Sequence, residues 1–144
     1  MSEYQLTAKL LRMSHSQTWD MAKLEWVLKD IEQVDDFETC LCGHFPIKEV
    51  CTIANNVTGS ETRIGNCCVK KFNNQSDKIF QAVKRIKKDS TRSVNAETLS
   101  FALSKRIVSQ RDYGFYMDIL RKRDLSPKQK SWKQGINIKL QKLL

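Results

Sequence analysis

The cysteines constrain this chain more than any other feature. All five cysteines of the 144 residues lie between residues 40 and 68, in the segments CLCGHFPIKEVC and IGNCCVKKF. Thiols clustered in this way indicate a metal site, a disulfide framework or a redox switch. The segment MSEYQLTAKLLRMSHSQ has no long apolar block and no small-residue cleavage site, so we predict no signal peptide and a cytoplasmic protein with reduced thiols. An odd number of cysteines also leaves one thiol over in any disulfide scheme. A metal site is therefore favoured.

Two short cysteine turns can supply the ligands of that site. The segment CLCG places Cys40 and Cys42 two residues apart before a glycine, and GNCC places Cys68 at the far end of a predicted hairpin. Two such turns facing each other would assemble a tetrahedral thiolate site of the structural zinc type. The CxC spacing is less usual than CxxC, and the competing interpretation is a set of buried cysteines without a metal.

The sequence leaves three candidates for the fourth ligand. Cys51 is placed first, although it lies on an apolar strand face and is equally consistent with a buried, unliganded thiol. His44 offers an imidazole two residues after Cys42. Cys67 would point away from Cys68 in an extended backbone, so we expect one of that pair to bind. The predicted metal ligands are Cys40, Cys42, Cys51 and Cys68.

The cysteine region carries a longer pattern, C-x-C-G-H-x-P-I-x-E-x-C, then N-x-x-x-G, then V-G-N-x-C-V-K-x-F. In this pattern the chain resembles an uncharacterised family of small zinc-binding proteins from bacteria and their phages and plasmids. The matching residues are Cys40, Cys42, Gly43, His44, Pro46, Ile47, Cys51, Asn55, Gly59, Gly65, Asn66, Cys68, Val69, Lys70 and Phe72. The resemblance implies a metal-stabilised core and a mobile-element context, and it implies no catalytic mechanism.

Apolar periodicity predicts the fold class. Met21, Leu24, Leu28 and Ile31 recur at three- and four-residue spacing, which predicts a helix over residues 16–34. The segments IKEVCTIA and SETRIG flank the turn signal NNVTG, which predicts a β-hairpin with cysteines near both ends. We therefore expect an α+β, mainly helical protein in which a small β-hairpin zinc-knuckle core is flanked by an N-terminal helix and several C-terminal helices.

The C-terminal half is predicted to be helical. The segments SDKIFQAVKRIKKD, NAETLSFALSKRIVSQ and DYGFYMDILRKRD each have an apolar face, with a break expected at Gly114. In LSPKQKSW, Ser126 is a helix cap, Pro127 takes the first helical position, and Gln129 completes a capping box. The predicted organisation is an acidic helical arm over residues 1–39, the zinc-binding hairpin core over 40–72, and a basic helical region over 73–144 that forms one compact unit with the core.

The charge is strongly asymmetric along the chain. Residues 1–39 carry 4 Lys and Arg against 8 Asp and Glu, whereas residues 73–144 carry 17 against 6. A basic half of this kind suggests a polyanionic partner, although an ordinary solvated helix surface explains any single lysine. The predicted phosphate-binding residues are Lys70, Lys71, Lys84, Arg85, Lys87 and Lys88. No segment is typical of base recognition, so we predict non-specific or shape-dependent binding of DNA or RNA. The alternative is a protein-binding adapter or an inhibitor of host machinery.

The sequence lacks the motifs of the enzyme classes considered. It has no His-x-Glu with a later Pro-Cys-x-x-Cys, as a zinc deaminase requires, and no glycine-rich phosphate loop. Thiolates committed to zinc are not available as nucleophiles. No apolar run approaches the length of a membrane-spanning helix. We therefore expect no enzymatic activity, no small-molecule substrate and no membrane partner.

Overall fold

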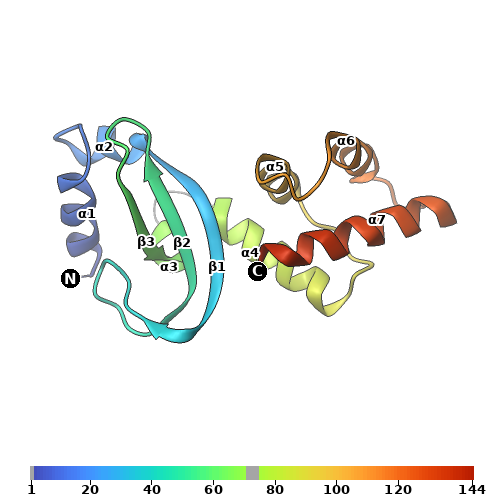
Figure 1. The fold of residues 1–144 in the computed structure, drawn as a ribbon, viewed down its shortest axis with the longest axis horizontal. Helices are drawn as coiled ribbons and strands as arrows, with labels where there is room; N and C mark the ends of the chain where they lie inside the picture. The colour runs from blue at the N-terminus through green and yellow to red at the C-terminus, as the bar shows by residue number, and fades with distance from the viewer. Residues whose placement is uncertain (1, 71–74) are drawn as a thin grey trace. The chain divides into compact units, whose positions relative to one another are not determined.

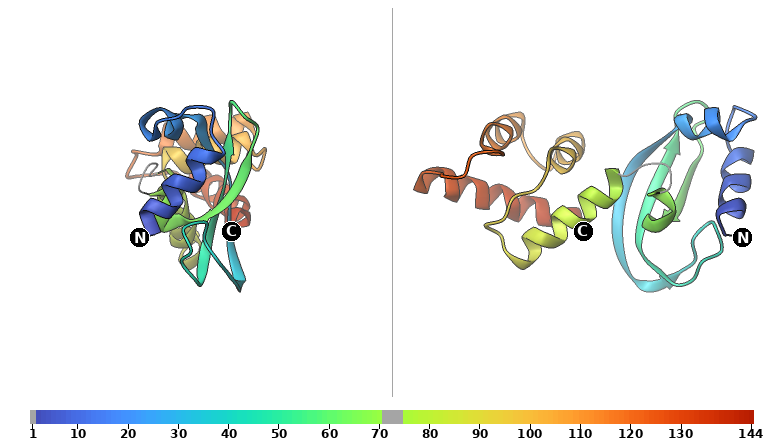
Figure 2. Two further views of the ribbon diagram at one scale, coloured as in Figure 1. Left: turned by 90° about the vertical axis from the view of Figure 1, so that its left-hand side faces the viewer. Right: turned by 180° about the vertical axis from the view of Figure 1, so that it is seen from behind.

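The computed structural model describes residues 2–70 and 75–144, and the chain divides into two compact units, residues 1–76 and 77–144. The first unit contains a three-stranded antiparallel sheet, and the second is helical (Figures 1 and 2). The α+β, mainly helical fold class is thereby confirmed. No helix among the described residues is long and apolar enough to cross a membrane.

The sheet has the strand order β1-β2-β3. Its strands are β1 (Trp26–Glu38), β2 (Ile47–Asn55) and β3 (Glu61–Gly65). The predicted hairpin is confirmed, because β2 and β3 pair in antiparallel register. The Oδ1 atom of Asn55 accepts hydrogen bonds from the backbone amides of Val57 and Thr58 in the turn. These bonds fix the hairpin connection.

The helix predicted over residues 16–34 is wrong. The segment contains only a short helix, α2 (Trp19–Ala22), and a 3-10 turn at Lys23–Glu25 before β1 begins. Met21 and Leu24, which contributed half of the apparent helical stripe, are 58% and 70% exposed. The three- and four-residue spacing therefore does not mark a buried helix face.

A β-bulge explains why β1 was not recognised. The pairing of β1 with β2 shifts register between Leu28 and Asp30, so β1 contains one extra residue there. Residues five apart on an ideal strand face opposite sides of the sheet. The extra residue allows both Trp26 and Ile31 to be buried, at 5% and 3% exposure. Because of the bulge, β1 lacks the strict alternation of apolar and polar residues that predicts a strand.

One end of the sheet is closed by the buried carboxylate of Glu25. It accepts hydrogen bonds of 2.8 Å from the backbone amides of His15 and Ser16, and one of 3.0 Å from Nδ2 of Asn55. The hydrogen bonds from Ser16, His15 and Asn55 outweigh burial and hold the pKa of Glu25 at about 2. Glu25 thus ties the segment before β1 to the β2–β3 turn.

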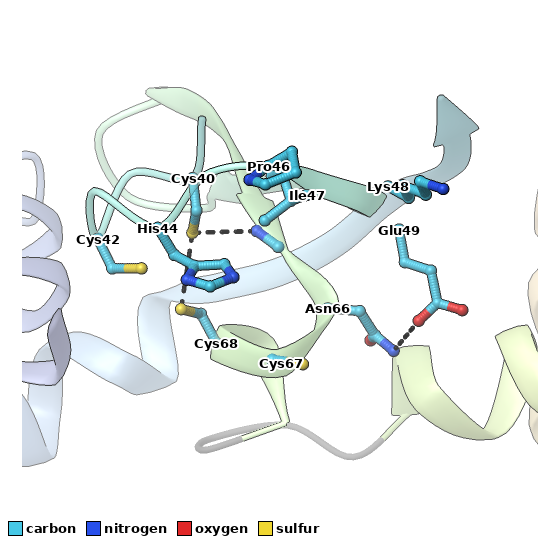
Figure 3. Close-up of a pocket in the computed structure, with 11 residues that line it drawn as sticks. Cys40, Cys42, His44, Pro46, Ile47, Lys48, Glu49, Asn66, Cys67 and Cys68 are labelled. Carbon is cyan, nitrogen blue, oxygen red and sulfur yellow. Dashed lines mark hydrogen bonds between the residues drawn. The ribbon is translucent and has the colours of Figure 1, made fainter. Parts of the chain in front are cut away.

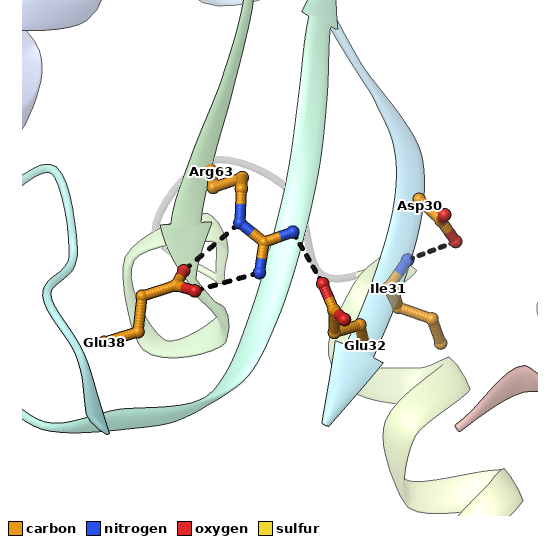
Figure 4. A network of polar contacts seen from close by, with 5 residues as sticks. All are labelled: Asp30, Ile31, Glu32, Glu38 and Arg63. Atoms are coloured by element: carbon orange, nitrogen blue, oxygen red, sulfur yellow. Dashed lines mark hydrogen bonds and ion pairs between the residues drawn. The ribbon is translucent and has the colours of Figure 1, made fainter. Parts of the chain in front are cut away.

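Arg63 spans the exposed surface of the sheet (Figure 4). From β3 it pairs with Glu32 and binds Glu38 through two nitrogens, at 3.3 Å and 3.0 Å. Both glutamates lie on β1, so the guanidinium reaches across β2. The pairing holds the end of β1, where the register with β2 is again irregular between Gln33 and Glu38. Arg63 and Glu32 are exposed and Glu38 is half-buried, so these ion pairs contribute little to the stability and mainly hold β1 in place.

Further helices occur after residue 74. They are α4 (Gln75–Lys88), α5 (Ala96–Ser104), α6 (Gln110–Ile119) and α7 (Pro127–Leu140). The predicted capping box of α7 is confirmed, with both reciprocal hydrogen bonds between Ser126 and Gln129. The break expected at Gly114 is wrong, since this glycine lies inside α6. The chain instead turns at residues 105–109, where Arg106 has a φ of +60°.

Candidate metal centre

Three buried thiols converge in the first unit. The sulfur atoms of Cys40, Cys42 and Cys68 all lie within 4.8 Å of one another (Figure 3). Their side chains are 3%, 3% and 6% exposed. Three of the four predicted metal ligands are therefore brought together, although they come from segments 26 to 28 residues apart in the sequence. Such a cluster can hold a metal ion.

The first two thiols are presented by a tight loop after β1. The amide of Cys40 donates to the carbonyl of His44 at 2.9 Å, and the amide of Gly43 donates to the carbonyl of Cys40 at 2.8 Å. Gly43 has a φ of +95°, a conformation that favours glycine. Lys9 of α1 (Ser2–Arg12) donates to the carbonyl of Leu41 at 2.8 Å. The loop is therefore shaped by its own backbone bonds and held by α1.

The third thiol follows β3. Cys68 lies on the one-turn helix α3 (Asn66–Val69), directly after Gly65. The amide of Gly65 donates to Sγ of Cys40 at 3.2 Å. A Cβ atom at position 65 would lie 3.2 Å from Cγ2 of Ile47, so a larger residue here would require the Ile47 side chain to shift.

The spacing of the sulfurs suits a tetrahedral ion. Sγ of Cys40 lies 3.6 Å from Sγ of Cys68. A zinc ion with Zn–S bonds of about 2.3 Å in tetrahedral geometry separates its sulfurs by about 3.8 Å. Burial and the hydrogen bonds with Cys42 and Cys40 raise the pKa of the Cys68 thiol. A thiolate here requires compensating positive charge, which a divalent cation supplies.

The structure does not bring Cys51 into this cluster. Cys51 is fully buried on β2, and its thiol donates to Oδ1 of Asn66 at 3.9 Å. Burial raises the pKa of Cys51 to about 12. Cys67 is exposed, and its thiol points away from the other three (Figure 3). His44 lines the same pocket as the three thiols and is exposed.

The cluster borders a pocket of about 460 Å³. His44, Lys48, Glu49, Asn66 and Cys67 are among the polar residues that line it (Figure 3). The three thiols are themselves almost fully buried, but they lie at the wall of a pocket rather than in the middle of the core.

Sequence reasoning missed a polar network beside the site. Nδ2 of Asn66 donates to Oε1 of Glu49 at 3.2 Å, and Oγ of Ser76 donates to Oδ1 of Asn66 at 2.7 Å. Asn66 and Ser76 are almost fully buried. The network joins β2, α3 and the first turn of α4. No local signal predicts it, since its members are 10 and 17 residues apart.

Of the six predicted phosphate-binding residues, two follow Cys68 closely in the sequence, Lys70 and Lys71, and the other four belong to α4. Lys70, at the end of α3, is exposed. Lys88 is exposed on α4, where Arg85 donates to the carbonyl of Ser93 at 3.3 Å and Lys87 to that of Leu144 at 3.0 Å. The other two predicted residues are Lys84, which is half-buried, and Lys71, which lies outside the described residues.

Comparison of the chain with models of known protein families, with curated proteins and with solved structures found no match in any of the three. The resemblance to a zinc-binding family of bacteria and mobile elements therefore stays a prediction.

Proposed function

We propose that this protein is a non-catalytic nucleic-acid-binding protein whose first unit is stabilised by a structural zinc ion. The observation that carries the proposal is the charge of the second unit. Residues 77–144 carry 17 Lys and Arg against 6 Asp and Glu, whereas residues 1–76 carry 8 against 10. A small helical unit with this excess of positive charge attracts polyanions, and nucleic acids are the polyanions with a regular array of phosphates.

The basic side chains that support the proposal are exposed. They occur at the end of α4, in the loop between α4 and α5, in the turn between α6 and α7, and in the first turn of α7. The residues are Lys88, Arg92, Arg121, Lys122, Arg123, Lys128 and Lys130. The amino end of α7 adds the positive end of its helix dipole to the last of these groups. Such a surface contacts phosphates without reading bases, which agrees with non-specific binding.

We propose zinc as the metal, with His44 as the fourth ligand. Three thiolates and an imidazole form a common ligand set of structural zinc sites. His44 is exposed in the pocket beside the thiols, so its side chain can rotate without disturbing the core. Cys51 is fully buried and does not line that pocket. Four protein ligands leave no open position for a substrate, which favours a structural role over a catalytic one.

The direct experiment measures zinc and nucleic-acid binding on the same sample. We expect one zinc ion per chain and binding of labelled DNA or RNA that weakens steeply with salt. Removal of one phosphate contact lowers the magnitude of the slope of log K against log salt by about 0.9 for duplex DNA and by about 0.7 for a single strand. Arg123→Gln should show this reduction, whereas Arg12→Gln, which removes an exposed arginine from the first unit, should not. A zinc-loaded protein that binds neither DNA nor RNA at low salt would refute the proposal.

The alternative function is a protein-binding adapter or inhibitor, and one observation favours it. Met21, Leu24 and Val57 are 58%, 70% and 58% exposed. The backbone amide of Asn56 donates to the carbonyl of Glu25 at 2.8 Å, so the turn containing Val57 is held beside the segment that follows Leu24. If nucleic-acid binding fails, Leu24→Gln should abolish capture of a protein partner from host lysate while leaving the zinc content unchanged.

A further inference from the structure

The second unit contains an aromatic stack next to basic side chains. The ring of Phe115 on α6 lies parallel to the ring of Trp132 on α7, with centroids 3.9 Å apart and an interplanar angle of 7°. The guanidinium of Arg111 lies 5.3 Å from the centroid of the Trp132 ring. Both aromatic residues are half-buried, and Arg111 is exposed. The Arg111 guanidinium therefore lies beside the indole at a place that solvent can reach.

The indole is held in a fixed orientation. Nε1 of Trp132 donates to Oδ1 of Asp112 at 3.0 Å, and Lys139 pairs with Oδ2 of Asp112 at 3.0 Å. Burial raises the pKa of Asp112, but the hydrogen bonds from Trp132 and Lys139 outweigh it, so the net pKa lies below the ordinary value. The carboxylate is thus charged at neutral pH, and it fixes the ring before any ligand arrives.

Two helix-interior glycines flank the stack. Gly114 lies one turn after Arg111 on α6, and Gly135 lies one turn after Trp132 on α7. Neither has a positive φ, and a Cβ atom added at either would meet no atom within 4 Å. Glycine inside a helix is destabilising relative to alanine. The fold itself therefore does not require glycine at these positions, and close approach of a ligand would account for it.

We propose that this surface binds single-stranded nucleic acid by stacking a base on the aromatic pair. A planar base takes the place of the Arg111 guanidinium beside Trp132, and the guanidinium turns to a flanking phosphate. Indole rings stack on guanidinium groups and on bases through the same ring face. Lys128, one turn before Trp132 on α7, is exposed and supplies a second phosphate contact. The inference deepens the proposed function and rests on it.

Gly135→Gln tests the stacking site. Glutamine is neutral and a better helix former than glycine, so the variant should unfold at the same temperature or higher. Its side chain nevertheless covers the open surface beside the indole. Affinity for a fluorescein-labelled oligothymidylate should fall about tenfold, within the range of one lost base–aromatic stack. Ser100→Gln, which adds the same side chain at an exposed position on α5, is the matched control and should bind normally.

Two further measurements sharpen the test. The wild type should bind the oligothymidylate more tightly than a duplex of the same length, because paired bases cannot reach the stack. Oligothymidylate should quench the tryptophan fluorescence, and Trp132→Phe should remove that quenching. Gly114→Gln is a second variant at the same surface and should also weaken binding.

The outcomes separate this inference from the proposed function. Equal, salt-dependent binding of single strand and duplex, unchanged by Gly135→Gln and Gly114→Gln, would refute the stacking site and leave the nucleic-acid-binding function standing. Failure to bind either form at low salt would refute both.

Discussion

Replacement of Cys51 by alanine separates the two assignments of the fourth zinc ligand. If Cys51 is a ligand, the variant loses a metal–sulfur bond. If His44 is the ligand, the variant loses only a buried sulfur atom. The structure favours the second case, because Cys51 is fully buried and its thiol contacts Asn66 rather than the three clustered thiols.

The expected loss of stability is small. Oδ1 of Asn66 keeps its hydrogen bond from Oγ of Ser76 at 2.7 Å, so the substitution leaves no buried acceptor without a donor. Loss of the buried sulfur, comparable to a methylene, costs about 0.8 kcal/mol of transfer free energy. A residual cavity on the order of 25 Å³ adds about 0.6 kcal/mol. Cys51→Ala should therefore lower the free energy of unfolding by about 1–2 kcal/mol.

The assay combines zinc content with the spectrum of the cobalt-substituted protein. Cys51→Ala should retain one zinc ion per chain and an unchanged sulfur-to-cobalt charge-transfer band. Cys68→Ala should lose zinc and unfold the first unit, because binding of a structural zinc ion contributes on the order of 10 kcal/mol to folding. His44→Ala should bind zinc more weakly than the wild type and keep the charge-transfer band. Zinc loss in Cys51→Ala as severe as in Cys68→Ala would show that the reasoning is wrong.

Other substitutions test the fold. The folded-state pKa of Glu25 is lowered to about 2 from 4.5, so the stability that its carboxylate contributes is complete above about pH 4.5 and is lost as the pH falls toward 2. The difference in unfolding free energy between the wild type and Glu25→Gln should therefore shrink over that range. A constant difference would count against the role given to the Glu25 carboxylate. Ser126→Ala removes the cap of α7 and should cost about 1 kcal/mol in chemical denaturation. Leu10→Ala removes a fully buried side chain of α1 and should cost about 2–5 kcal/mol, whereas a loss below 1 kcal/mol would contradict its place in the core.

Features set by a few neighbouring residues were predictable from the sequence. The β2–β3 turn depends on Asn55 and the residues that follow it, and the α7 start depends on Ser126, Pro127 and Gln129. Each contains its own hydrogen-bonding partners within a few residues. β1 was not predictable, because its bulge removes the alternation and its pairing partners on β2 lie 9 to 29 residues away in the sequence.

The position of Cys51 outside the thiol cluster was not predictable for a related reason. Strand alternation places Cys51 on the same face as Ile47, which lines the pocket. Four residues along a strand, however, span about 13 Å, so a shared face does not imply a shared site. The position of Cys51 beside Asn66 depends on α3, and no sequence pattern shows where α3 lies against β2.

β1, which the sequence did not predict, helps to assemble the candidate metal centre. β1 and β3 are both antiparallel to β2, so both run in the same direction and terminate at the same end of the sheet. Cys40 follows the end of β1 and Cys68 follows the end of β3, and the two thiols therefore meet beside the start of β2. Glu25 closes the opposite end of the sheet, where Trp26 pairs with Asn55. The sheet of the first unit is thus fixed at one end by a carboxylate and at the other end by the thiol cluster. A chelator should therefore destabilise the wild type and Glu25→Gln to the same extent, because the carboxylate and the cluster act at opposite ends of the sheet.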